Sequence, residues 1–316
     1  MKKLRIAFLG TPDVSVPFLD KILNLSFCET AGVITQPDRP NGRGLSLRPS
    51  PVSVFAEKKG LKIYKPAKRI DLNRAVAELA PDIGFTVAYG RIISETALAS
   101  AGTGFLNVHF SLLPKYRGAA PVQRSIMNGE KETGVSIFWL DKGMDTGPMC
   151  LQRKIRLPQE YDAGALFGSL SALGLEMTEQ VLSDVAAGSV SRTPQEGEPS
   201  LAPMLGTEDS ALDFNKTAEH NYNLVRGLSM GPQARFFILK NGSPSAVIVT
   251  AAGFSDQENG RAARGEITFV DKDGSVGIRC LSGDLILKTI KPEGKKNMPA
   301  AAFLNGLRLK KGSSLV

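Results

Sequence analysis

The sequence has little cysteine and little histidine: its 316 residues include three Cys and two His. Cys28, Cys150 and Cys280 are far apart and odd in number, which argues against a disulfide framework and fits a reducing cytoplasm. With two histidines and no C-x-x-C pair, a zinc site is not expected. We therefore predict a cytoplasmic protein that needs no metal.

Long hydrophobic runs are also missing. No apolar run reaches the ~20 residues that a membrane span requires, so no membrane association is expected. The basic and apolar start, Met1 to Gly10, is too short for a secretion signal and predicts a first β-strand. The turn after it, Gly10 to Asp13, resembles the first strand-to-helix turn of a doubly wound fold. It lacks the G-x-G-x-x-G pattern, so no dinucleotide site is predicted.

The composition is that of an ordinary globular protein, with 42% hydrophobic and 22% charged residues. The length allows two domains. The formal net charge of +8 favours an anionic partner without identifying one.

Strands alternate with helices over residues 1–188, which predicts an α/β domain with a parallel sheet covered on both faces. Residues 189–206 are rich in Ser, Thr, Pro, Glu and Gly without periodicity and indicate a linker. In residues 207–316 a helix at 215–227 precedes several short strands with turn signals. They predict a small antiparallel β-barrel of OB-like size.

Polar residues with acid–base chemistry gather around two apolar, strand-like runs. Asn107 and His109 stand two apart in the first run, and a strand alternates its faces, so both side chains point the same way. The second run leads into a turn that holds Asp145. In a parallel sheet, such residues lie at or just after the carboxyl ends of strands. Singly, each has a plainer explanation as a core, capping or turn residue; together they form a plausible acid–base site.

Two segments are basic. Residues 36–51 hold four prolines, two glycines and three arginines, and we expect an irregular loop. It fits a solvated surface loop and an arginine-bearing arm that grips phosphates about equally. Residues 288–311 contain seven Lys or Arg and one Glu, which suits a solvated tail or a nucleic-acid surface.

Longer motifs carry a family resemblance. N-V-H-F-S-L-L-P-K-Y-R-G-A-A-P at 107–121, followed by D-K-G-M-D-T-G at 141–147, resembles the folate-dependent formyltransferases. Stretches at 36–44, 87–90 and 291–298 resemble the branch of that family that acts on initiator methionyl-tRNA. The resemblance covers nearly the whole chain. It implies a Rossmann-like N-terminal domain joined to an OB-like barrel.

The resemblance further implies an enzyme, which we expect to be a cytoplasmic monomer. It would move the formyl group of 10-formyltetrahydrofolate to the α-amine of methionine on initiator tRNA. Carried over by motif, Asn107, His109 and Asp145 would be catalytic, and Arg43 would meet the acceptor stem. The residues implied for the folate site are Tyr89, Gly90, Ile92, Ser111, Leu112, Leu113 and Pro114.

The chemistry suits these roles. The methionyl amine must lose a proton, and the oxyanion that forms needs hydrogen-bond donors. Asn107 can donate from its amide and His109 from its ring. Asp145 can orient the imidazole and stabilise its charged form, or help to take the proton. No metal is required, because the formyl donor is already activated.

The chain departs from the family pattern at 202–205, which is apolar where a basic residue is usual, and at 229–234. Both departures concern the linker's contact with RNA. Two other functions stay open. A formyltransferase for a nucleotide-linked amino sugar would share the Asn, His and Asp set. A non-enzymic RNA-binding protein would use the barrel alone. The Arg43 loop and the basic barrel favour tRNA over a sugar.

Overall fold

The computed structural model describes residues 3–41, 46–240, 242–257 and 261–315. The chain forms two compact units. Unit 1 comprises residues 1–121, 133–155 and 168–203, and unit 2 comprises residues 122–132, 156–167 and 204–316. Because these units interleave along the chain, the domain limits at 188 and 206 stay a prediction. In the described part of the chain, no helix is long and apolar enough to cross a membrane.

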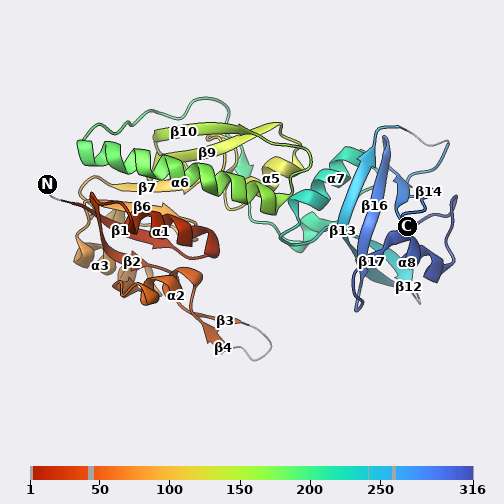
Figure 1. Ribbon diagram of the computed structural model, residues 1–316, viewed down its shortest axis with the longest axis horizontal. Helices are drawn as coiled ribbons and strands as arrows, with labels where there is room; N and C mark the ends of the chain where they lie inside the picture. Colours follow the sequence, from red (N-terminus) through yellow and green to blue (C-terminus); the bar gives the residue numbers. More distant parts are fainter. Residues whose placement is uncertain (1–2, 42–45, 241, 258–260, 316) are drawn as a thin grey trace. The chain divides into compact units, whose positions relative to one another are not determined.

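Unit 1 is built on a seven-stranded sheet in the order β10-β9-β7-β6-β1-β2-β5 (Figure 1). Its strands are β1 (Leu4–Gly10), β2 (Cys28–Ile34), β5 (Ile63–Tyr64), β6 (Ile83–Val87), β7 (Phe105–His109), β9 (Glu132–Trp139) and β10 (Met149–Arg156). The pairs from β5 through to β7 are parallel, whereas β9 pairs with β7 in the antiparallel sense. The predicted α/β class with a mostly parallel sheet is confirmed, with β9 as the exception.

Helices cover both faces of this sheet. They are α1 (Val16–Leu23), α2 (Pro51–Lys58), α3 (Arg69–Leu79), α4 (Glu95–Leu98) and α6 (Ala163–Ala187), with a 3-10 turn η1 (Asp13–Ser15) before α1. Ser50 begins α2 by accepting a hydrogen bond from the Ser53 N–H, and proline at the first helical position suits that start. Residues of α3 and α4 pack in one core cluster with Ala7 and Leu9 of β1. On the other face, Gly174 brings the α6 backbone against Phe18 and β7.

The register of β7 decides where its polar residues point. Phe105 belongs to the cluster beneath α3 and α4, while Val108 contacts α6 at Gly174. Since side chains alternate along a strand, Asn107 and His109 lie on the face of Phe105, away from α6. The expectation that both share one face therefore agrees with the packing.

The basic segment at 36–51 is not irregular as expected. Its described part contains β3 (Arg39–Asn41) and β4 (Ser46–Arg48), which form an antiparallel pair with Pro40 opposite Leu47. Proline normally argues against a strand, but each strand of a two-stranded ribbon is an edge and can leave an N–H position empty. Arg43 lies outside the described residues.

The segment that the sequence presents as a linker is hydrogen-bonded along unit 1. Thr193 forms a bridge with Met149, and β11 (Leu201–Ala202) pairs in parallel with β8 (Arg117–Gly118). These contacts are made by backbone groups in a segment without hydrophobic periodicity. The composition therefore indicated a linker without regular structure.

Unit 2 contains an antiparallel sheet in the order β12-β13-β16-β15-β14, with β17 beside β16 (Figure 1). Its elements are α5 (Pro121–Met127), η2 (Thr207–Ser210), α7 (Ala218–Gly227), β12 (Arg235–Lys240), β13 (Ser243–Ser255), β14 (Ile267–Val270), β15 (Val276–Arg279), β16 (Asp284–Pro292), β17 (Met298–Pro299) and α8 (Ala300–Leu307). The predicted antiparallel C-terminal β-domain is confirmed. Helix α8 was not predicted: Phe303 and Leu304 are buried in the core, so residues 288–311 are not simply a solvated tail.

Candidate active site

Asn107 stands in the middle of β7, opposite Thr86 of β6 and Phe138 of β9. Its side chain is half-buried. Within the described residues, no hydrogen bond ties down its amide. The Asn107 amide is therefore free to donate to a bound group.

His109 ends the same strand and is 5% exposed. Its Nε2 lies 2.9 Å from the carbonyl oxygen of Tyr116, and its Nδ1 lies 3.6 Å from Oδ2 of Asp145. A carbonyl can only accept, so Nε2 carries the hydrogen, and Nδ1 holds the lone pair when the ring is neutral. The ring of Phe138 packs edge-on against the imidazole.

The charge state of His109 follows from opposing effects. Burial lowers the pKa of His109 and outweighs the Asp145 carboxylate and the hydrogen bond to Tyr116, which both raise it. The ring is accordingly neutral at pH 7, with an unprotonated Nδ1 facing a carboxylate. This arrangement leaves the Nδ1 lone pair available as a proton acceptor, with the Asp145 carboxylate beside it.

The sequence suggested that Asp145 lies at the carboxyl end of a parallel strand. The structure shows otherwise, because the strand before it, β9, is antiparallel. Because β9 is antiparallel to β7, its last residue, Trp139, lies beside Leu106. The chain leaves β9 there, with the Leu140 N–H donating to the Phe105 carbonyl at 2.7 Å. The following turn runs back along β7 and brings Asp145 to His109.

The turn at 141–147 is held by its own side chains. Oδ1 of Asp141 accepts from the Gly143 N–H at 2.9 Å and from the Thr146 hydroxyl at 2.7 Å. Gly147 is required by a close approach, since a Cβ there would lie 1.8 Å from the Trp139 carbonyl oxygen. Asp145 has φ +55°, an uncommon left-handed conformation for a residue with a Cβ. Asp141 thus builds the turn, and Asp145 presents the carboxylate.

Gly118 connects the turn to the loop after β7. Its N–H donates to Oδ2 of Asp145 at 2.8 Å. Its φ is +123°, and a Cβ there would lie 2.7 Å from the Ala202 carbonyl oxygen of β11. Only glycine fits such a position. The carboxylate is therefore fixed by a backbone donor on one side and faces the imidazole on the other.

Most of the residues after β7 that were predicted to bind folate are buried or hydrogen-bonded within their own loop. The Ser111 hydroxyl is fully buried and donates to the Lys115 carbonyl at 2.7 Å. Leu113 and Pro114 are buried, whereas Leu112 is half-buried. These residues shape the wall around His109, and Leu112 is the one whose side chain is partly open to solvent.

The predicted residues after β6 divide in the same way. Tyr89 packs in the core, its carbonyl accepts from Thr11 and Gln36, and its buried hydroxyl has no hydrogen-bond partner within the described residues. Gly90 is exposed. Ile92 is 88% exposed, which is unusual for so large an apolar side chain. Both residues follow the carboxyl end of β6, beside that of β7.

The structure thus brings Asn107, His109 and Asp145 together with the 111–118 loop. Three contacts of the candidate site escaped the sequence-based prediction: the Tyr116 carbonyl with His109, the Gly118 N–H with Asp145, and the Gln195 side chain with the Asp145 carbonyl. The R-G pair at 117–118 was a possible signal for Gly118. Nothing in the composition of residues 189–206 points to Gln195.

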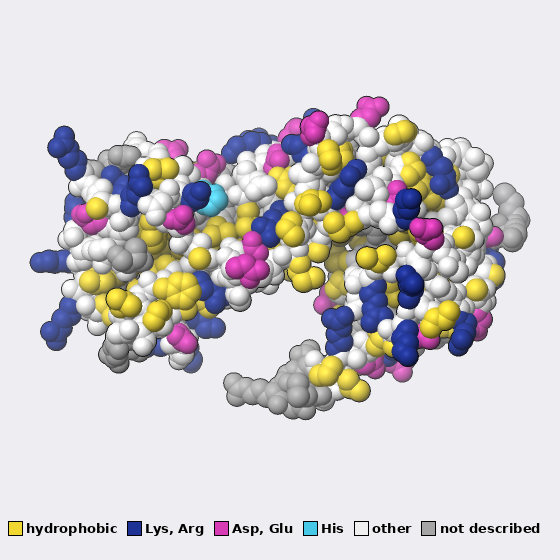
Figure 2. Space-filling view, turned by 180° about the vertical axis from the view of Figure 1, so that it is seen from behind, with side chains coloured by type: hydrophobic (Ala, Val, Ile, Leu, Met, Phe, Trp, Pro, Cys, Tyr) yellow, Lys and Arg dark blue, Asp and Glu magenta, His cyan; other side chains and the backbone are white. Residues whose placement is uncertain are grey.

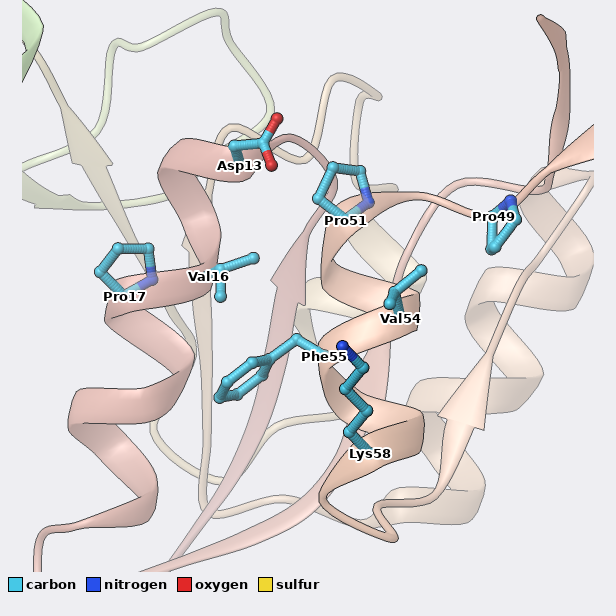
Figure 3. A pocket seen from close by; sticks show the side chains of 8 residues that line it. All are labelled: Asp13, Val16, Pro17, Pro49, Pro51, Val54, Phe55 and Lys58. Atoms are coloured by element: carbon cyan, nitrogen blue, oxygen red, sulfur yellow. The ribbon is translucent and has the colours of Figure 1, made fainter.

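An open hollow of about 490 Å³ lies elsewhere, between α1 and α2 (Figure 3). It is lined by Asp13, Val16, Pro17, Pro49, Pro51, Val54, Phe55 and Lys58. None of these residues was predicted to bind folate or to act in catalysis. In the described part of the chain, no cluster of His, Cys, Asp or Glu could hold a metal ion.

Comparisons with known proteins agree with the predicted resemblance. Residues 4–182 match the family model "Formyl transferase", and residues 204–308 match "Formyl transferase, C-terminal domain". The methionyl-tRNA formyltransferase of Elusimicrobium minutum is 38% identical over 98% of both chains. The methionyl-tRNA formyltransferase of Thermus thermophilus is 40% identical over 99% of both chains.

Solved structures share the fold at lower identity. An N-formyltransferase from Helicobacter canadensis, in complex with folinic acid and dTDP-3-aminofucose, has a TM-score of 0.66 and 20% identity and covers 91% of this chain and 98% of its own. HypX from Aquifex aeolicus, in complex with tetrahydrofolic acid, has a TM-score of 0.62 and 17% identity over 98% of this chain and 49% of its own. At these identities the likeness concerns the fold alone.

Proposed function

This chain belongs to the methionyl-tRNA formyltransferase family, and on that basis we propose that Asn107, His109 and Asp145 carry out its formyl transfer. As a member of the family, the chain is an enzyme that formylates methionyl-tRNA. We propose 10-formyltetrahydrofolate as the donor and the initiator tRNA, which starts protein synthesis, as the acceptor. The observation that carries the proposal is the neutral imidazole of His109 facing the Asp145 carboxylate, 3.6 Å away.

The residues at the strand ends fit a folate donor. Ile92 presents an exposed apolar side chain after β6, and Leu112 presents a partly open one after β7. A folate ring whose face covered both side chains would remove them from water, which is favourable. When bound, the donor supplies a formyl carbon that is already activated toward an amine. The remaining Tyr89, Gly90, Ser111, Leu113 and Pro114 would shape the pocket through their backbone and packing.

Deprotonation of the acceptor amine falls to the His109–Asp145 pair. Nδ1 of His109 is the nitrogen with the free lone pair, because Nε2–H already donates to Tyr116. A proton taken up at Nδ1 would lie between the ring and Oδ2 of Asp145, whose charge stabilises the imidazolium. The imidazolium can then release that proton to the leaving nitrogen.

Stabilisation of the oxyanion falls to Asn107. Its amide is free of hydrogen bonds within the described residues, stands on the same face as His109 and points away from α6. A donor held on a strand needs little reorganisation when charge develops, which is how such groups lower a barrier. The sequence-based hypothesis gave His109 a share in this role, but its Nε2–H is already engaged.

The relatives favour tRNA over an amino sugar, because full-length identity with methionyl-tRNA formyltransferases reaches 40%, against 20% for the sugar N-formyltransferase fold. We propose a cytoplasmic monomer, since its substrates are cytoplasmic and Asn107, His109 and Asp145 come together within a single chain.

The decisive experiment is a formyl-transfer assay with labelled 10-formyltetrahydrofolate. Charged initiator tRNA, charged elongator methionyl-tRNA and a nucleotide-linked amino sugar are offered in parallel. We expect label on the methionine of the initiator tRNA and little on the other two acceptors. Label on the sugar and none on tRNA would overturn the proposal.

A further inference from the structure

Gln195 makes four hydrogen bonds from a segment that lacks any regular pattern. Its Nε2 donates to the carbonyl oxygens of Asp145, at 2.8 Å, and of Gly147, at 2.9 Å. Its Oε1 accepts from Nη2 and Nε of Arg117, at 2.6 Å and 3.3 Å. All of these residues belong to unit 1. One amide thus joins the turn after β9 to the loop after β7.

Both connected elements bear directly on the reaction pair. Arg117 precedes Gly118, whose N–H donates to Oδ2 of Asp145. The Asp145 carboxylate is therefore held through its side chain by Gly118 and through its own peptide by Gln195. Because Gln195 also holds Arg117, a shift of either element would be resisted by the other.

The turn at Asp145 needs such support. A residue with a Cβ rarely stays in the left-handed region unless its surroundings impose it. The Gln195 Nε2 donates to the Asp145 and Gly147 carbonyl groups, and these two bonds fix the Asp145–Thr146 and Gly147–Pro148 peptides. Within the described residues, the charged group that acts on the His109 ring is Asp145; the Tyr116 carbonyl and the Phe138 ring complete its surroundings.

We propose that Gln195 is a positioning residue that holds the Asp145 carboxylate at its working distance from His109. The inference rests on the proposed roles of Asp145 and His109 and extends them to a segment that otherwise connects the two sheets. Ser200, in the same segment, helps to position His109 by holding Tyr116. Its hydroxyl oxygen accepts from the Tyr116 N–H at 2.9 Å, next to the carbonyl that accepts from His109.

The test compares Gln195→Ala with a matched control, Gln180→Ala. Gln180 is likewise an amide that accepts from an arginine of unit 1, Arg153, but it lies on α6, which packs on the face of β7 opposite to His109. We expect Gln195→Ala to lower kcat by roughly ten- to a hundredfold, the scale for a small misplacement of reacting groups, with KM for both substrates nearly unchanged. Gln180→Ala should keep the parent kcat.

A second readout separates positioning from stability. The chain has two histidines, so the NMR titration of His109 can be followed with His220 as an internal reference. Asp145 raises the pKa of His109, so its displacement in Gln195→Ala should lower that pKa further and leave His220 unchanged. A lower melting temperature with unchanged kcat and unchanged His109 titration would show a purely structural role and overturn the proposal.

Two more variants complete the design. Gln195→Glu keeps an acceptor for Arg117 but places an oxygen against the two carbonyl groups, so it should lose as much kcat as Gln195→Ala. Parent-like turnover in Gln195→Glu would overturn the proposal, since Arg117 alone would then suffice. Asp145→Asn tests the underlying function: if its turnover is normal, the catalytic assignment fails whatever Gln195 does.

Discussion

The proposed reaction residues and the proposed acceptor-binding residues differ in how they are held. His109 and Asp145 are largely enclosed and bonded to backbone groups of one unit. Many basic residues of unit 2, by contrast, are exposed. Figure 2 shows Lys and Arg side chains interspersed with acidic and hydrophobic ones. Exposed examples are Lys288, Lys291, Lys295 and Lys296. Proton transfer requires fixed distances, whereas attraction to a phosphate backbone works with dispersed charge.

The largest expected effect comes from substituting the enclosed residues His109 and Asp145. His109→Ala removes the proton acceptor, and we expect kcat to fall by about 10²- to 10⁴-fold, the range for losing a general acid–base group. Asp145→Asn keeps the shape but removes the charge that stabilises the imidazolium, so a loss in kcat is expected there too. Circular dichroism confirms folding, and near-normal turnover in both variants would contradict the assignment.

A smaller effect is expected from removing a single proposed contact with the acceptor, here Arg43 in the basic segment at 36–51 of unit 1. Arg43→Ala should raise KM for tRNA and leave folate binding unchanged, because Arg43 is proposed to contact an acceptor-stem phosphate. The dependence of log K on log salt should also become shallower by roughly one. Arg74→Ala, an exposed arginine of α3, serves as the control. An unchanged KM for tRNA would sink the contact.

The smallest expected effect is on the free energy of unfolding, which the burial of His109 makes dependent on pH. Burial lowers the pKa of His109 from its ordinary value of 6.5, so the unfolded chain binds a proton more readily than the folded one. The free energy of unfolding should hence be fully retained above pH 6.5 and decline as the pH falls toward the folded pKa. A difference of one between the pKa of the folded chain and that of the unfolded chain changes the free energy of unfolding by about 1.4 kcal/mol.

Urea unfolding at pH 7.5 and pH 5.5 measures this decline. His109→Gln should reduce it, while His220 remains to contribute in the same direction, because burial lowers its pKa as well. A decline of unchanged size in His109→Gln would show that the enclosure of His109 has no energetic consequence.

Much of the site follows from local rules. The shared face of Asn107 and His109 needs only the alternation of a strand, and the long helix α6 needs only its hydrophobic period. These features depend on residues a few positions apart. The motif at 141–147 likewise builds its own turn through Asp141 and Gly147.

What could not be predicted depends on pairing between distant residues. The antiparallel direction of β9 is a property of the sheet order, and it alone explains why Asp145 must return along β7. Gln195 meets Asp145 from 50 positions away, in a stretch whose composition is that of a loop. The pairing of Pro40 with Leu47 also contradicts the low preference of proline for strands. It is possible because β3 and β4 form a two-stranded sheet in which each strand is an edge.

The chain contains a single tryptophan, Trp139, and it lies where the connecting segment docks on unit 1. Its Nε1 donates to the Ser191 carbonyl at 2.9 Å, and the Arg192 guanidinium covers the ring at 3.7 Å from its centroid. Any release of this segment uncovers the indole to water. The molecule therefore carries an intrinsic fluorescent reporter, without a label, whose emission follows the attachment of the segment that bears Gln195.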